Sequence, residues 1–137
     1  MKTVLKLSLF LLPSLSSPAL AQWSPPTACD RFSGYEIQSC LTREMSQADM
    51  RLNEAYRRAQ AAIVADPRTP ADQKAVWQDN LTKAQRAWIA FRDADCLFDL
   101  IGAEWHDGSG TTAAQQACVL DKTQRRAKEL TDRYTAN

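Results

Sequence analysis

The amino-acid sequence predicts an all-α protein, an antiparallel bundle of three main helices stapled by two disulfides. Three segments repeat apolar residues at the three- and four-residue spacing of amphipathic helices, and no segment alternates as a strand does. The four cysteines all follow an export-type leader, and an even number of exported cysteines favours disulfides. One proline-rich and one glycine-rich interruption separate the three segments, so neighbouring helices should fold back on one another.

Residues 1–21 have the features of a secretory signal peptide. Two lysines accompany a leucine-rich run over residues 4–15, and residues 19–21 (ALA) form a small-x-small cleavage pattern. The apolar run is short and is interrupted by proline and serine, which argues against the alternative, a membrane anchor. We therefore expect residues 1–21 to be removed and residues 22–137 to form one helical domain.

The processed chain would be close to neutral. The sequence carries 17 basic and 16 acidic residues, and removal of Lys2 and Lys6 leaves 15 against 16. This balance argues against nucleic acid as a partner. Cys29 lies eight residues beyond the expected cut, too far to carry a lipid, so we expect a periplasmic or secreted protein without membrane attachment. The absence of any C-x-x-C pair argues against zinc and redox catalysis, and no cofactor is expected.

The first helix is predicted over about residues 34–65, after a lead-in broken by prolines. Ser33 and Glu36 are spaced as a capping box. Nothing interrupts the periodicity before Asp66 and Pro67. The apolar stripe of this helix comprises Ile37, Leu41, Met45, Ala48, Leu52, Ala55, Ala59 and Ile63.

The second helix is predicted to follow the turn DPRTP at residues 66–70 and to end near Ile101, where Gly102 can stop it. Thr69 can cap this helix, and Pro70 is favoured as its first residue. The residues that we expect to face the core are Trp77, Leu81, Ala84, Trp88 and Phe91.

Residues 102–111 are predicted to be a loop, because they hold three of the four glycines and show no periodicity. Thr112 and Gln115 are spaced as a capping box for the third helix. The apolar stripe of that helix is thinner and comprises Ala113, Ala117, Leu120, Ala127, Leu130 and Tyr134.

The antiparallel arrangement favours one of the three pairings that four cysteines allow. Cys96 and Cys118 each lie eleven residues from Asp107, the centre of the predicted loop, and positions equidistant from a helical turn face one another. The favoured bridges are therefore Cys96 to Cys118 and, with the remaining pair, Cys29 to Cys40.

Polar residues, aromatic residues and leucines recur at helical spacing in all three predicted helices. They are Asp49, Leu52, Asn53 and Tyr56 in the first, Gln85, Trp88 and Arg92 before Cys96 in the second, and Thr123, Arg126 and Leu130 after Cys118 in the third. With the Gly108-Ser109 pair before the last cysteine, this pattern resembles the LprI-type lysozyme inhibitor family over residues 29–130. The resemblance implies an exported helical bundle that binds and inhibits lysozyme and so protects the bacterial wall.

The polar members of these motifs have a structural interpretation. They lie on the shoulders of the apolar stripes, where a half-buried guanidinium such as that of Arg92 or Arg126 needs hydrogen-bond partners. We expect these side chains to bond one another across the helix interfaces. No nucleophile with an adjacent base can be assembled from them, so we predict no catalytic residue and no enzyme activity.

The glycine-rich loop is the predicted partner-binding site. Its candidate contact residues are Asp99, Glu104, Trp105, His106, Asp107, Gly108, Ser109 and Gly110. An aromatic side chain beside flexible backbone, held at its base by a disulfide, is typical of a recognition loop. The alternative is a solvent-exposed connection with Trp105 folded back on the core.

Acidic residues gather around this loop. They are Asp93, Asp95, Asp99, Glu104 and Asp107, and the three aspartates before residue 100 lie where the helix dipole disfavours anions. These acids would steer a cationic partner such as lysozyme, or would serve solubility alone. His106 is the single histidine and lacks companions for a closed metal site, so no metal is expected.

Two functions fit these observations. The first is a lysozyme-binding inhibitor that occludes the muramidase cleft with the loop. The second is a periplasmic protein-interaction module without affinity for lysozyme. The class of lysozyme and the oligomeric state are left open by the sequence.

Overall fold

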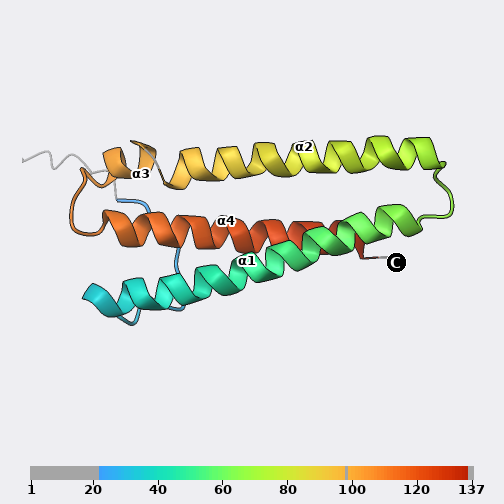
Figure 1. Cartoon of the computed structure of the whole chain (residues 1–137). Helices are drawn as coiled ribbons and strands as arrows, with labels where there is room; N and C mark the ends of the chain where they lie inside the picture. The colour runs from blue at the N-terminus through green and yellow to red at the C-terminus, as the bar shows by residue number, and fades with distance from the viewer. Residues whose placement is uncertain (1–21, 98, 136–137) are drawn as a thin grey trace, which may run out of the picture.

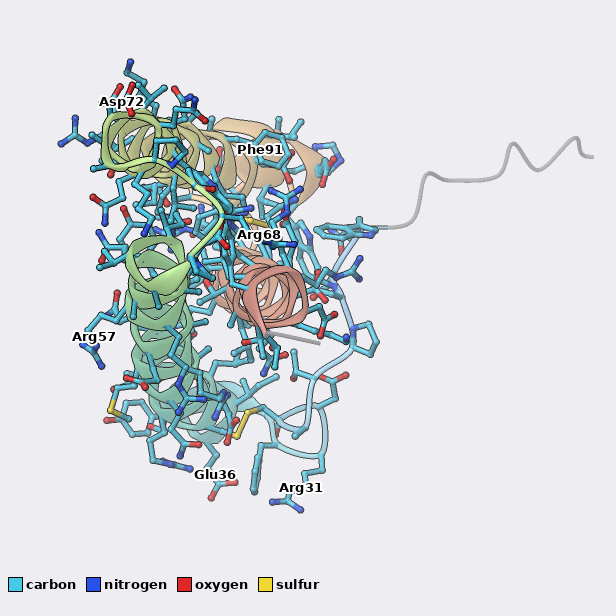
Figure 2. The ribbon with its side chains drawn as sticks, turned by 90° about the vertical axis from the view of Figure 1, so that its right-hand side faces the viewer. Arg31, Glu36, Arg57, Arg68, Asp72 and Phe91 are labelled. Atoms are coloured by element: carbon cyan, nitrogen blue, oxygen red, sulfur yellow. A yellow bond between two sulfur atoms is a disulfide. The ribbon has the colours of Figure 1, made fainter. Side chains whose placement is uncertain are left out.

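The computed structural model describes residues 22–97 and 99–135. These residues form four helices and no strand: α1 (Gly34–Ala65), α2 (Ala71–Cys96), α3 (Asp99–Glu104) and α4 (Thr111–Tyr134). α2 runs antiparallel to α1 and α4 (Figure 1), and the three long helices form a triangle when viewed along their length (Figure 2). The predicted all-α bundle is confirmed. The signal-peptide prediction, on residues 1–21, falls outside the described residues.

The core lies mainly between α1 and α4. Seven side chains of α1 and nine of α4 are buried, whereas α2 buries only two of its 26 residues. The central cluster comprises Leu52, Ala55, Ala59 and Ile63 from α1, Leu81 from α2, and Ala127 and Leu130 from α4. α2 therefore lies against a helix pair that is largely complete without it. No helix within the described ranges has the length and apolar character that a membrane span requires.

α2 turns a different face toward the bundle from the predicted one. The prediction that these residues face the core was wrong for Ala84 and Phe91, which are exposed, and for Trp77, which is 38% exposed. Leu81 is buried as expected, and Trp88 packs at the edge of the central cluster. The disulfide at the end of α2 and a polar contact in its middle fix the rotation of the helix. Its buried face is consequently displaced by about 60° from the predicted stripe.

α2 ends at Cys96 and not near Ile101, so the predicted end was wrong. At 100° per residue, a straight helix would place Ile101 about 140° around from Cys96, on the side away from the bundle. The break at Leu97 instead lets Ile101 pack, fully buried, in one cluster with Cys96 and Cys118. The short helix α3 occupies the first part of the predicted loop, which shrinks to residues 105–110.

The predicted capping boxes do not form. Gly34 begins α1 with φ of +54°, a left-handed conformation, and the Glu36 amide donates to the backbone oxygen of Ser33 at 3.2 Å. The side chain of Ser33 makes no cap bond. α4 starts at Thr111, so Thr112 lies inside the helix and cannot cap it.

The α1–α2 turn is also closed differently from the prediction. Thr69 Oγ1 donates to Asp66 Oδ2 at 2.6 Å and therefore does not cap α2. Pro70 is the cap residue, and Ala71 is the first helical residue. The threonine stabilises the turn itself instead of the helix after it.

Both predicted disulfides are confirmed. One joins Cys29 to Cys40 and ties the lead-in to α1, and the other joins Cys96 to Cys118 and ties the end of α2 to α4. The second pairing holds although α2 is shorter than predicted, because α3 and the loop still return the chain symmetrically to α4.

Candidate functional site

The loop of residues 105–110, at the left-hand tip of the bundle in Figure 1, has a closely bonded backbone. The Asp107 amide donates to Gly102 O at 2.9 Å, and the Gly108 amide donates to Trp105 O at 2.9 Å. His106 and Asp107 have backbone φ angles of 51° and 49°, in a region that residues other than glycine rarely adopt. Strained backbone of this kind persists where the surroundings hold it and is concentrated at functional loops.

Trp105 lies folded back on the protein, as in the alternative considered from the sequence. Its ring is half-buried against the cluster that contains Ile101 and the Cys96–Cys118 bridge. Its Nε1 donates to the backbone oxygen of Trp23 at 2.9 Å. The indole therefore anchors the loop to both the disulfide cluster and the N-terminal lead-in.

The Trp105 ring packs so close to Gly110 that residue 110 has no room for a side chain. A Cβ at residue 110 would lie 2.1 Å from Trp105 Cζ3. We expect Gly110→Ala to displace the ring and to lower the free energy of unfolding by about 1–3 kcal/mol, as overpacking does. Urea unfolding followed by tryptophan fluorescence measures this change.

Ser109→Ala is the matched control for that prediction, because Ser109 is an exposed neighbour in the same loop. Its effect should stay within about 0.5 kcal/mol. An unchanged stability for Gly110→Ala would contradict the anchoring role of Trp105.

The loop surface open to a partner consists of four consecutive residues. His106, Asp107, Gly108 and Ser109 are all exposed, and Glu104 is exposed one turn earlier. The side chain of Asp99 lies outside the described residues. The structure thus brings most of the predicted contact residues together at one tip, with Trp105 and Gly110 beneath them.

The negative charge near the loop is smaller than the five acids suggest. Asp93 pairs with Arg92 at 2.7 Å, and Asp95 pairs with Lys122 of α4 at 2.9 Å. Among residues 22–97 and 99–135, no ion pair involves Glu104 or Asp107. Among the five acids, these two have described carboxylates without an ion pair, so they contribute free negative charge at the tip.

A polar contact between α2 and α4 joins two of the motif residues. Arg126 is 8% exposed, and its Nε donates to Gln85 Oε1 at 3.1 Å. A further guanidinium nitrogen of Arg126 lies 2.8 Å from the half-exposed carboxylate of Glu129. One bond of this guanidinium therefore crosses the α2–α4 interface and the other stays within α4, and the first is the kind of contact that the structural interpretation expects.

The other polar motif residues divide into two groups. Tyr56 of α1 shares a hydrogen bond with Thr82 of α2 at 3.1 Å between their oxygens. Arg92 pairs within its own helix and lies over the Trp88 ring, 5.2 Å from its centroid. In contrast, Asp49 and Asn53 are exposed, and no side-chain hydrogen bond within the described ranges links them to α2 or α4. Leu52 and Leu130 lie in the core.

A comparison with known families includes all of these motif residues. The model of the family described as lysozyme inhibitor LprI matches residues 29–130 of the chain. The chain belongs to the LprI family. The match begins at the first cysteine and ends at the last motif leucine, so it includes both disulfides and the loop. Two disulfides also fit the exported character expected of an LprI protein.

Two relatives of this LprI chain are described as uncharacterized proteins. It is 33% identical to the uncharacterized protein R02472 of Rhizobium meliloti (strain 1021), over 90% of this chain and 89% of the relative. It is 35% identical to the uncharacterized protein YecT of Escherichia coli (strain K12), over 69% of this chain and 60% of the relative. No solved structure matches the chain significantly.

Thr123 of the LprI motif does not share in the hydrogen bonding expected of the polar motif residues. It is fully buried, and within the described residues its Oγ1 has no hydrogen-bond partner. Burying an unpaired hydroxyl costs free energy, so we expect Thr123→Val to raise the free energy of unfolding by about 1 kcal/mol. Denaturant unfolding measures the change, and a clear loss of stability would show that the hydroxyl has a stabilising partner.

Sequence reasoning missed three residues that contact the site and motif side chains of this LprI chain. Thr82 lies one turn before Gln85 on the same face of α2, and that spacing could have identified it. Lys122 follows Cys118 by one turn, and its contact with Asp95 follows once the disulfide is placed. Trp23, whose backbone oxygen holds Trp105, gave no signal, because the lead-in has no periodicity.

Proposed function

We propose that this LprI chain is an exported protein, periplasmic or secreted, that binds lysozyme and covers the substrate cleft of the muramidase with the loop of residues 105–110. The protein contributes no chemistry of its own. The observation that carries the proposal is a braced loop at the tip of a bundle of the lysozyme inhibitor family.

The bracing of the loop supports inhibition by steric occlusion. The Cys96–Cys118 bridge fixes the base, the Trp105 anchor fixes the first residue of the loop, and backbone hydrogen bonds fix the turn at Gly108. A loop that is already ordered loses little conformational entropy when it docks, so more of the contact energy appears as affinity.

The charge of the tip supports the choice of a cationic partner. Glu104 and Asp107 are exposed and carry no ion pair in the described part of the chain. Lysozymes are generally cationic, so these carboxylates would speed association at low ionic strength and lose that effect as salt is added. The contact itself would come from His106 to Ser109, with Trp105 holding them in place.

A muramidase turnover assay with stoichiometric processed protein tests the proposal. We expect inhibition of at least one lysozyme class that weakens as salt rises. Failure to inhibit any class would reject the proposal, and capture of a different envelope protein on immobilised chain would then favour an interaction module.

Matched charge variants test the role of the loop within that assay. Asp107→Asn removes the charge while keeping a residue type that tolerates positive φ. Together with Glu104→Gln it should slow association about tenfold at low salt. Asp72→Asn, at the other end of the bundle (Figure 2), is the control and should leave association unchanged. If inhibition survives both His106→Ala and Trp105→Ala, the loop does not make the contact with lysozyme.

A further inference from the structure

A hollow lies at the end of the bundle opposite the loop. Its volume is about 860 Å³, and its walls come from the end of α1, the α1–α2 turn, the second turn of α2 and the end of α4. Arg68, labelled in Figure 2, belongs to it and lies between the ends of the three helices. A volume of this size accommodates a small molecule.

One wall of the hollow is an aromatic pair. Trp77 Nε1 donates to Tyr134 Oη at 3.2 Å, and the two ring centroids lie 6.1 Å apart with planes tilted by 39°. The indole N–H is therefore already bonded, although Trp77 as a whole remains 38% exposed. What the pair offers to a ligand is ring surface and the Tyr134 hydroxyl proton. Ala62 and Ala65 are small and leave room beside the rings.

Two arginines give the hollow its charge. The side chain of Arg68 is 90% exposed and lies 3.2 Å from Asp66, while Arg133 is exposed and has no ion pair in the described part of the chain. Hydrogen bonds from Thr69 and then from Arg68 hold the pKa of Asp66 below its usual value, so that carboxyl is ionised near neutral pH. The lining carries two positive charges and one negative charge.

The helix ends limit how much negative charge the hollow can accept. α1 and α4 both end here, and the carbonyl ends of their dipoles oppose an anion, whereas only α2 begins here. These partial charges and Asp66 oppose a phosphate with two charges. A single carboxylate, which a guanidinium can bind through two parallel hydrogen bonds, matches the remaining charge.

We propose that this hollow binds a saccharide that carries one carboxylate, with the sugar ring on the Trp77 and Tyr134 side chains and the carboxylate between Arg68 and Arg133. The exposed ring surface suits the apolar face of a sugar. The Tyr134 hydroxyl, which can still donate its proton, suits a sugar hydroxyl. Because the site is remote from the loop, the proposal does not depend on lysozyme binding, and either can fail without the other.

Titration of the processed chain with two related sugars tests the proposal. N-acetylmuramic acid carries a carboxylate, and N-acetylglucosamine has a similar ring without it. The titration is followed by the indole N–H signals of the four tryptophans in NMR spectra. We expect only the Trp77 signal to shift saturably, and only with N-acetylmuramic acid. Trp77→Phe assigns the signal. Absence of a saturable shift, or an equal response to both sugars, would overturn the proposal.

Arginine variants distinguish the site from general electrostatic attraction. Arg68→Gln and Arg133→Gln should each weaken binding of N-acetylmuramic acid about tenfold, the loss expected when a charged hydrogen-bond partner is removed. Arg86→Gln is the matched control, because Arg86 is an exposed arginine of α2 outside the hollow. Equal effects of all three substitutions, or no effect of the first two, would show that the hollow is not the binding site.

Discussion

Replacing Cys96 and Cys118 together by alanine is expected to lower the free energy of unfolding by about 3–5 kcal/mol. The bridge spans 22 residues, which accounts for about 3 kcal/mol in the chain-entropy treatment, and the buried sulfur atoms add packing against Ile101. α2 should lose most, because Leu81 is its only other buried residue. Denaturant unfolding gives the free energy, and hydrogen exchange should show α2 amides opening before those of α1 and α4.

The Cys29–Cys40 bridge is the internal control for this prediction. It spans 11 residues, so its removal should cost about 0.6 kcal/mol less in chain entropy and should leave α2 protected from exchange. If loss of the Cys96–Cys118 bridge changed stability by less than about 1 kcal/mol, α2 would have to be held by contacts other than those described.

Arg126→Ala is expected to lower the free energy of unfolding by about 2–4 kcal/mol. The substitution removes a buried side chain from α4 and leaves Gln85 Oε1 without its donor. Glu129 contributes little to this loss, because its carboxylate is half exposed and such pairs are worth about 0–1 kcal/mol. Glu129→Gln should therefore change stability by less than about 0.5 kcal/mol.

A double-mutant cycle between Arg126 and Gln85 separates the two interpretations of the LprI motif. A coupling free energy of about 1–2 kcal/mol is expected if the pair joins α4 to α2. Should Arg126→Ala instead keep its stability and lose lysozyme inhibition, Arg126 would belong to a binding surface and the structural interpretation would fail.

The helix boundaries show what a pattern of apolar residues can and cannot predict. α1 occupies residues 34–65 as expected, because its long stripe meets α4 over most of its length. The predictions of the inward face and of the end of α2 were wrong. That helix is oriented by the pairs Arg126–Gln85 and Cys96–Cys118 and not by apolar burial. Hydrophobic periodicity carries no information about such specific contacts.

The candidate site was predictable in composition but not in shape. Glycines and turn residues located the loop, and the positions of Cys96 and Cys118 located its base. The inward position of Trp105 depends on a backbone oxygen 82 positions earlier in the chain, which no local pattern encodes. The hollow at the other end was not predicted, because its residues come from three segments that become neighbours only in the folded protein.

The weak attachment of α2 has a consequence for damage by proteases. One disulfide lies entirely before α2 and the other joins its last residue to α4, so a single cut inside α2 would give two pieces, each with its own closed bridge. α1 and α4 would fall in different pieces, yet the buried side chains between them would still hold the halves together. We expect a nicked molecule to remain assembled in solution. The two pieces should separate only when a denaturant disrupts the packing between α1 and α4.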